Sequence, residues 1–254
     1  MRAKLAGGKR AFGVFCEIPV PEAVEIAGIA GWDFVIIDCE HAPITARLLP
    51  EMVRAAETAG ISAIVRTASN EESAIQHALD AGAAGVQIPQ IASVEAAQKA
   101  IRAARFHPLG RRGLNPFVRA AKFSSTPAAD FLKKSNEETA LILQIESAEG
   151  VAAVDEIIEL GGVDVLFAGP YDLSQSLGIP GEVADPRVFA AGAALARKAE
   201  ARGVAAGVFV SNADDARRWL DAGVRYLCYS VDSVLLLNAM RQAAVNIRAL
   251  CPPR

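Results

Sequence analysis

The sequence is poor in aromatic residues and carries no excess of positive charge. Phenylalanine, tyrosine and tryptophan make up 6% of its 254 residues, whereas hydrophobic residues make up 52%, so the core must consist mainly of Ala, Val, Ile and Leu. The formal net charge is −3, and no stretch interleaves Lys or Arg with aromatic residues as a nucleic-acid surface does. We therefore expect small-molecule partners, and neither nucleic acid nor membrane.

Long apolar runs and paired cysteine motifs are also missing. The first ten residues are charged and lead into a short apolar stretch, unlike a signal peptide or a membrane span. The cysteines show no CxxC spacing, so we expect reduced structural thiols and neither disulfides nor a zinc site. They are Cys16, Cys39, Cys228 and Cys251. Together these features predict a cytoplasmic protein.

One pattern recurs along the chain: an Ala-rich helical stretch ends in glycine, and a short run of β-branched residues follows. Glycine just past the last helical residue is a common helix terminator. Eight strand and helix units in one domain (1–254) predict an α/β protein of the (β/α)8 TIM-barrel type, with an open doubly wound sheet as the alternative. The expected strands span 11–18, 33–38, 62–67, 84–89, 140–147, 163–169, 204–210 and 226–230.

Two segments depart from this repeat. The stretch from Phe106 to Glu138 is too long for an ordinary connection, so we interpret it as a functional loop or an oligomer contact. The last helical stretch, Ser233 to Leu250, is apolar nearly all round, which a barrel helix facing water does not require. We therefore expect this last helix to pack on another subunit.

Polar residues gather where the expected strands end. In a (β/α)8 barrel the chemistry takes place at this end, because the loops that follow the strands meet there. The expected second, third, fifth and sixth strands are the richest in such residues. These are Asp38, Glu40, His41, Arg66, Gln144, Glu146 and Asp172.

Glu146 and Asp172 follow neighbouring strands, and a carboxylate in the mouth of a barrel needs a cation. Two oxygen donors with open positions suit Mg²⁺ or Mn²⁺. Pairing with Arg66 explains the same acids equally well, so both interpretations stand. Asp172 also fits the cap of a short helix over 173–177.

His41 is the one histidine at a strand end, and its flanking acids can keep its pKa near neutrality, as a general base requires. Arg66 is expected to hold an anionic oxygen or to form a structural ion pair. No lysine lies on an expected strand, and only Lys122, in the long segment, is placed to reach the site. Schiff-base chemistry is therefore disfavoured.

Four stretches resemble the HpcH/HpaI family of class II pyruvate aldolases: EIPVPEAVEIAGIAGWDFVIIDCEHAP, the arginine of AIVRT, LQIES and LFAGPYDLSQSLG. The resemblance implies a carbon–carbon lyase that cleaves a 4-hydroxy-2-oxo acid reversibly to pyruvate and an aldehyde through a metal-bound pyruvate enolate. It implies a divalent metal cofactor, Mg²⁺ or Mn²⁺, with Co²⁺ as a further candidate. It also implies a homohexamer, a trimer of dimers, in which the C-terminal helix is exchanged between subunits.

The resemblance also assigns roles to particular residues. Glu146 and Asp172 resemble the metal ligands, and His41 resembles the catalytic base. Asp80 resembles the acid that pairs with this histidine, from the facing subunit. The implied substrate contacts are Arg66, Gln144, Gly169, Pro170, Tyr171 and Asp172, with Asp38 and Glu40 orienting the histidine or the metal's waters.

The resemblance leaves the substrate open. Tyr171 stands where some members carry a small residue, so we expect a narrowed aldehyde pocket. Oxaloacetate decarboxylation and hydroxyacyl-CoA cleavage pass through the same kind of enolate and are the enzymatic alternatives. The non-enzymatic alternative is a 2-oxo acid binding or scaffold protein.

Overall fold

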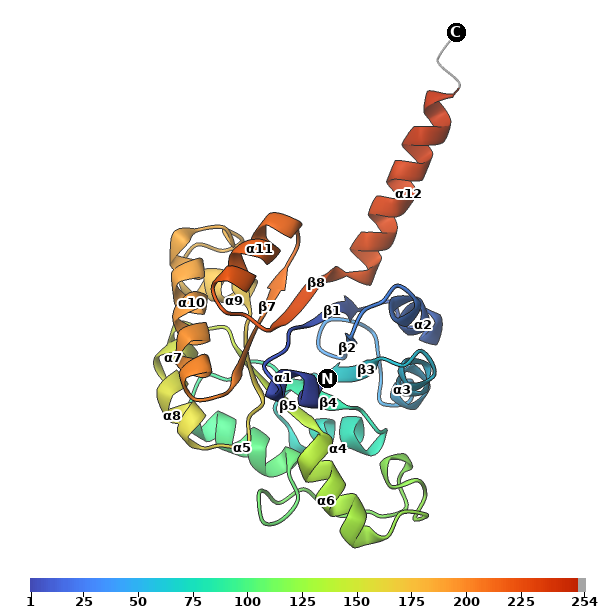
Figure 1. Cartoon of the computed structure of the whole chain (residues 1–254), viewed down its shortest axis with the longest axis vertical. Coiled ribbons are helices and arrows are strands. Elements are labelled where there is room, and N and C mark those ends of the chain that lie inside the picture. Colours follow the sequence, from blue (N-terminus) through green and yellow to red (C-terminus); the bar gives the residue numbers. More distant parts are fainter. Residues whose placement is uncertain (251–254) are drawn as a thin grey trace.

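The chain forms a closed barrel of eight parallel strands that run in sequence order from β1 to β8 (Figure 1). This computed structural model describes residues 1–250, so Cys251 lies outside the described residues. The strands are β1 (Ala11–Cys16), β2 (Phe34–Asp38), β3 (Ser62–Arg66), β4 (Gly85–Ile88), β5 (Ala140–Ile145), β6 (Val165–Ala168), β7 (Ala205–Val210) and β8 (Tyr226–Val231). Each lies within an expected strand or extends it by one residue, which confirms the (β/α)8 architecture.

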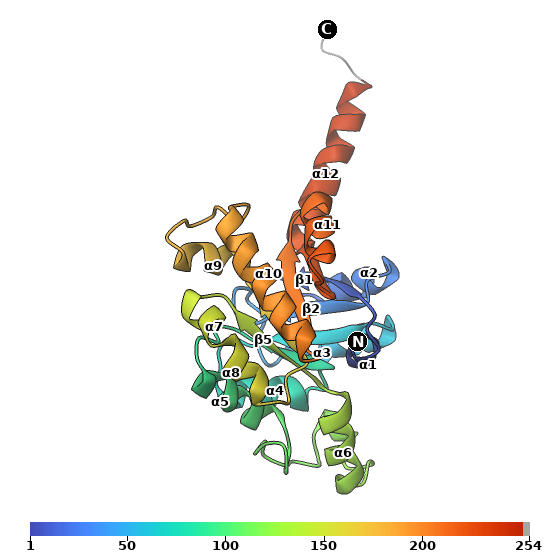
Figure 2. The same cartoon turned by 60° about the vertical axis from the view of Figure 1, so that its left-hand side comes forward.

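Helices alternate with the strands and cover the outside of the barrel (Figures 1 and 2). The expected terminators are confirmed where they can be tested; Gly31, for example, follows α2 with a φ of +92°, a conformation that favours glycine. Outside the segment 106–138, the helices between the strands are α2 (Pro21–Ile29), α3 (Leu49–Thr58), α4 (Glu72–Asp80), α5 (Val94–Ala104), α7 (Ala148–Ala152), α8 (Val154–Glu159), α9 (Pro170–Ser176), α10 (Pro186–Ala201) and α11 (Ala213–Asp221).

The core has two layers. Alternate strand residues such as Phe34, Ile64 and Tyr226 fill the inside of the barrel, where the rings of Phe34 and Tyr226 stack with centroids 4.2 Å apart. The other strand residues pack outward against the helices. Helix α1 (Arg2–Ala6), which the sequence did not predict, precedes β1 and adds Leu5 to the inner layer. Side chains thus fill the barrel below its mouth.

The segment 106–138 is structured. It contains the short helix η1 (Arg119–Ala121) and helix α6 (Ala128–Glu138), and Phe106, Ala121 and Phe131 form a small core beneath them. The interpretation of this segment as a loop was therefore wrong over residues 128–138, where α6 forms. Its contact with another subunit stays a prediction.

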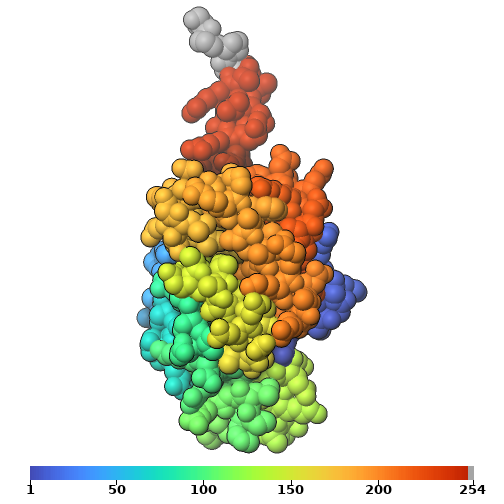
Figure 3. All heavy atoms as spheres, turned by 90° about the vertical axis from the view of Figure 1, so that its left-hand side faces the viewer, coloured from blue at the N-terminus to red at the C-terminus, as the bar shows by residue number. Residues whose placement is uncertain are grey.

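The last helix, α12 (Asp232–Ala249), leaves the barrel and projects away from it (Figure 3). None of its residues is buried within this chain. Its exposed large apolar side chains include Val234, Leu236, Leu237, Met240, Val245 and Ile247. Within residues 1–250, no helix combines the length and the apolar character needed to span a membrane.

Candidate active site

The register of the barrel brings three polar side chains together at the ends of neighbouring strands. Asp38 on β2 lies opposite Arg66 on β3, and Arg66 lies opposite Gln87 on β4. All three are buried. Cys39, the first residue after β2, packs instead against the outer layer, and burial raises the pKa of its thiol to about 12. Cys39 therefore takes no part in the polar cluster.

Arg66 is held by a two-pronged ion pair with Asp38. Its Nε and Nη2 donate to the two carboxylate oxygens of Asp38 at 2.8 and 2.7 Å. Burial alone would lower the pKa of Arg66, but the hydrogen bonds and charge of Asp38, together with the charges of Glu40 and Glu146, outweigh it and raise the pKa. Removing one member of such a buried pair costs about 3–5 kcal/mol. Asp38 thus positions Arg66, whereas the sequence had suggested that it orients the histidine or a metal's waters.

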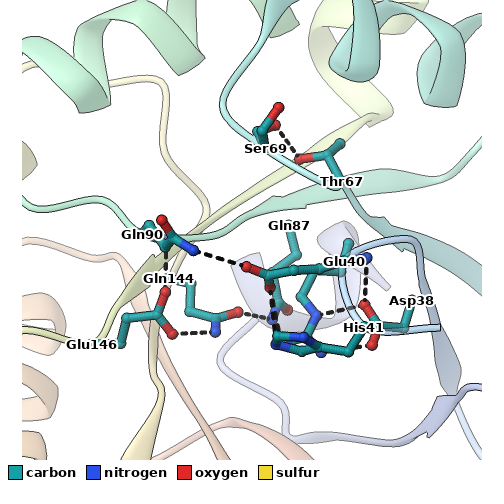
Figure 4. Close-up of polar contacts among 10 residues, drawn as sticks. Asp38, Glu40, His41, Thr67, Ser69, Gln87, Gln90, Gln144 and Glu146 are labelled. Carbon is teal, nitrogen blue, oxygen red and sulfur yellow. Dashed lines mark hydrogen bonds and ion pairs between the residues drawn. The ribbon is translucent and has the colours of Figure 1, made fainter. Parts of the chain in front are cut away.

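His41 lies in the loop after β2, beside Glu40 (Figure 4). A carboxylate oxygen of Glu40 is 3.8 Å from His41 Nε2 and 3.3 Å from Arg66 Nη1. The Glu40 side chain is 9% exposed, whereas that of His41 is 64% exposed. The imidazole can therefore exchange protons with a bound molecule while a buried acid stands next to it.

Glu146 sits at the end of a chain of amide groups that crosses the mouth of the barrel (Figure 4). Gln87 Nε2 donates to Gln144 Oε1 at 2.7 Å, and Gln144 Nε2 donates to Glu146. Burial raises the pKa of Glu146 to about 7, although the hydrogen bonds from Gln144 and from the Gln90 backbone oppose the rise, and the charge of Asp172 adds to it. A buried acid beside another acid is a site at which a cation would be stabilised.

Gln90 contacts both Glu146 and Glu40, and its backbone conformation is strained. Its φ is +56°, which is uncommon for a residue other than glycine and costs about 1–3 kcal/mol. The backbone N–H donates to Glu146 Oε1 at 2.7 Å, and the side-chain amide donates to Glu40 Oε1 at 3.2 Å. The sequence offered no signal for this role, because a positive φ cannot be read from glutamine.

We expect Gln90→Ala to lower kcat/KM about 10–100-fold, as is typical when a residue that orients a ligand is removed. Gln90→Gly should lower kcat/KM similarly, because both variants keep the backbone N–H but lack the side-chain amide that reaches Glu40. Steady-state kinetics with Gln98→Ala, at an exposed position of α5, as the control would test this. Unchanged activity in both Gln90 variants would contradict a positioning role.

Asp172 lies in the first turn of α9, but it does not cap that helix. Gly169 is the N-terminal cap residue, and no side chain caps the helix, so the expectation for Asp172 as a cap was wrong. A Cβ at Gly169 would meet a carboxylate oxygen of Glu146 at 2.7 Å, so only glycine leaves that carboxylate in place. The carboxyl group of Asp172 is thus left beside Glu146.

Glu146 and Asp172 fit a divalent cation that takes most of its ligands from elsewhere. Within residues 1–250, no group of three or more His, Cys, Asp or Glu side chains could hold a metal ion. Mg²⁺ and similar hard cations are bound by one or two carboxylates, with water and substrate oxygens completing the shell. The two carboxylates and the absence of a thiol between them match that chemistry.

A cavity of about 260 Å³ opens at this end of the barrel. It contains most of the predicted site residues, namely His41, Arg66, Gln144, Gly169, Pro170, Tyr171 and Asp172. Glu146 and Glu40 line an adjoining hollow together with His41 and Asp172. Among the described residues, no lysine lines the cavity, and Lys122 lies in a different hollow beside α6.

Asp80 is the predicted site residue that lies apart from the others. It ends α4, on the side of the barrel where the strands begin, and Arg112 donates to its Oδ1 at 2.6 Å. Arg112 also lies over the ring of Phe106, 4.5 Å from its centroid, which ties the segment after α5 to the barrel. Within one chain, Asp80 does not meet His41, and pairing across subunits stays a prediction.

Comparison with known proteins gives consistent results. The sequence profile of the family described as HpcH/HpaI aldolase/citrate lyase matches residues 11–239. A hydroxypyruvate/pyruvate aldolase of Paraburkholderia phytofirmans is 33% identical, covering 98% of this chain and 97% of the relative. A 4-hydroxy-2-oxo-heptane-1,7-dioate aldolase of Escherichia coli is 30% identical, covering 98% of this chain and 94% of the relative. A family protein from Burkholderia cenocepacia superposes with a TM-score of 0.92 at 36% identity, covering 97% and 98%.

Proposed function

The chain belongs to the HpcH/HpaI aldolase/citrate lyase family, and from this premise we propose that it cleaves 4-hydroxy-2-oxo acids reversibly to pyruvate and an aldehyde. The observation that carries this proposal is the cavity that joins Arg66, His41 and Asp172, with Glu146 alongside. At one opening, the two carboxylates can bind a cation, Arg66 can bind an anionic oxygen, and His41 can act as a base. Aldolase names among the relatives favour a lyase over a non-enzymatic scaffold.

The polar side of the cavity holds the 2-oxo acid. Two of the N–H groups of Arg66 are taken by Asp38, so its Nη1 is directed toward Glu40 and the cavity. A guanidinium fixed in this way donates to the substrate without reorganising, which is how preorganised donors stabilise developing charge. Gln144 adds a second polar contact beside it.

Glu146 and Asp172 are the residues that would hold a divalent cation, Mg²⁺ or Mn²⁺. Such a cation, when bound, would polarise the keto group and stabilise the negative charge that develops during cleavage. The amide chain from Gln87 through Gln144, together with the N–H of Gln90, holds the Glu146 carboxylate in one orientation.

His41 is the base. It takes the proton of the C4 hydroxyl group as the C3–C4 bond breaks, so the O–H electrons form the aldehyde carbonyl and the bonding pair of C3–C4 enters the pyruvate enolate. Protonation at C3 then gives pyruvate. A carboxylate oxygen of Glu40 lies 3.8 Å from His41 Nε2. In the reverse direction His41 returns the proton to the new hydroxyl group.

We also propose that the chain acts as a homo-oligomer. The support is α12, which projects away from its own barrel (Figure 1) and carries several exposed large apolar side chains. Large exposed apolar patches are uncommon on monomeric soluble proteins and are typical of surfaces that contact another molecule. The facing subunit would then be the source of the Asp80 that pairs with His41.

Metal depletion tests the proposed function most directly. Protein stripped with EDTA should release no pyruvate from 4-hydroxy-2-oxo acids, and Mg²⁺ or Mn²⁺ should restore release. Borohydride with pyruvate should not inactivate the enzyme, because no lysine lines the cavity in the described part of the chain. Activity that survives chelation, or that borohydride abolishes, would overturn the metal-assisted mechanism in favour of a lysine one.

A further inference from the structure

The cavity has two chemically different halves. Strands β2 to β5, with Asp172 after β6, supply the charged and amide groups described above. The remaining strands supply apolar groups and a single acid. This second half consists of Phe167 on β6, Phe209 on β7, Val231 on β8, Phe15 and Glu17 at the end of β1, and Tyr171 on α9.

Four of these residues form one continuous aromatic wall, defined as Phe15, Phe167, Phe209 and Tyr171. Phe15 meets Phe167 and Phe209 edge to face, with ring centroids 6.4 and 5.8 Å apart. Tyr171 meets Phe209 at 6.0 Å. Phe15 and Phe167 are buried, 4% and 1% exposed, so Tyr171, which is 52% exposed, and the partly buried Phe209 supply most of the accessible aromatic surface. A flat ligand group can pack against the faces and edges of these aromatic rings.

The border between the halves is marked by Arg66, whose guanidinium carbon lies 4.7 Å from the centroid of Phe15. The 2-oxo acid end of a substrate must lie on the polar side, because the cation ligands and Arg66 are there. Carbon C4 and its substituent then extend across this border toward the aromatic wall. The aromatic half is therefore the place for the aldehyde.

Glu17 gives this half a negative charge and no positive one. Its backbone N–H donates to Asp232 Oδ1 at 3.0 Å, and that of Ile18 donates to Oδ2 at 3.1 Å, which fixes the turn after β1. Among the described residues that line the aromatic half, none is Lys, Arg or His. An aldehyde with its own carboxylate would meet the like charge of Glu17 here, and the guanidinium at the border, Arg66, is already paired with Asp38 and Glu40.

We propose that the aromatic half receives the aldehyde and selects uncharged aldehydes with an apolar, preferably flat body over aldehydes that carry a carboxylate. This inference rests on the proposed aldolase function and narrows its substrate class. Glu17 acts as the specificity residue against anions, and the aromatic wall provides the favourable contact. Rejection by an unpaired or repelled charge is a stronger discriminator than a loss of apolar contact.

Aldol addition of pyruvate to three aldehydes at pH 8 with Mn²⁺ tests the selectivity. Butanal and succinate semialdehyde have the same number of carbons and differ by a terminal carboxylate, and benzaldehyde adds a flat ring. We expect kcat/KM for butanal and benzaldehyde to exceed that for succinate semialdehyde at least tenfold. Equal or better use of succinate semialdehyde would overturn the inference.

Exchange of the pyruvate methyl protons with D₂O, followed by NMR without any aldehyde, separates this inference from the proposed function. Exchange reports enolate formation and does not depend on the aldehyde half. Lack of exchange would count against the aldolase proposal itself. Exchange combined with a preference for succinate semialdehyde would overturn only the inference on selectivity.

Two variants locate the selectivity in particular residues. Glu17→Gln should raise the ratio of kcat/KM for succinate semialdehyde to that for butanal at least fivefold, whereas Glu25→Gln, on the exposed face of α2, should leave that ratio unchanged. Phe209→Ala should lower the ratio of kcat/KM for benzaldehyde to that for butanal. Because each ratio is measured within one variant, partial loss of folded protein cancels. A Glu17→Gln ratio equal to that of Glu25→Gln would refute the role of Glu17.

Discussion

Glu146→Gln is expected to lower kcat/KM for retro-aldol cleavage by at least about a hundredfold and to abolish binding of Mn²⁺. Glutamine keeps the shape of the side chain but removes the charge that a divalent cation needs. Loss of one group that stabilises developing negative charge costs about 10²–10³ in rate, and here the lost group also anchors the cation that supplies this stabilisation.

Calorimetric titration with Mn²⁺ and steady-state kinetics on the same preparation would measure both effects. Glu149→Gln is the matched control, because this acid lies three residues further along the chain but is exposed on α7. Circular dichroism would verify that both variants fold. If Glu146→Gln bound Mn²⁺ as tightly as the wild type, the assignment of the carboxylate pair as the cation site would be wrong.

His41→Ala is expected to slow cleavage of a 4-hydroxy-2-oxo acid by about 10²–10⁴-fold, the usual contribution of a positioned general base. Decarboxylation of oxaloacetate should fall less than tenfold. That reaction forms the same enolate but removes no proton from a C4 hydroxyl group, so it does not need the base. The comparison therefore isolates one role of one residue.

Pyruvate release from both substrates, measured on one batch of each variant, gives the two effects. His77→Ala provides the control, since this histidine is exposed on α4 and far from the cavity in the barrel. An equal loss of both activities would mean that His41 supports binding or folding, and the base would have to be sought among other groups at the cavity, with Glu17 and Glu40 the first to test.

The repeat of Ala-rich helices, terminal glycines and β-branched runs was sufficient to predict the eight strands. Local rules carry this information, because a helix terminator and an apolar run act within a few residues. The same rules failed for α6, which buries only Phe131, and for α1, which is five residues long. The position of α1 depends on contacts with distant segments, because its residue Leu5 packs inside the barrel.

The strand-end residues were also legible in the sequence, because a closed parallel barrel brings all its strand ends to one opening. The residues with which they pair could not be predicted from the sequence. Asp38 was expected to orient the histidine or the metal's waters, and nothing in the sequence indicated that the register between β2 and β3 pairs it with Arg66. Gln90 was a polar residue without a role until its backbone conformation aimed it at both Glu40 and Glu146.

The sequence by itself determined the barrel, the type of chemistry at its mouth and the family to which the chain belongs, because each depends on residue types in a fixed order. Only the tertiary structure decided which acid holds Arg66, which amides orient Glu146, and that Glu17 and four aromatic residues from separate elements share one half of the cavity. The physical reason is that these pairings depend on strand register and barrel closure, which bring together residues up to about two hundred positions apart.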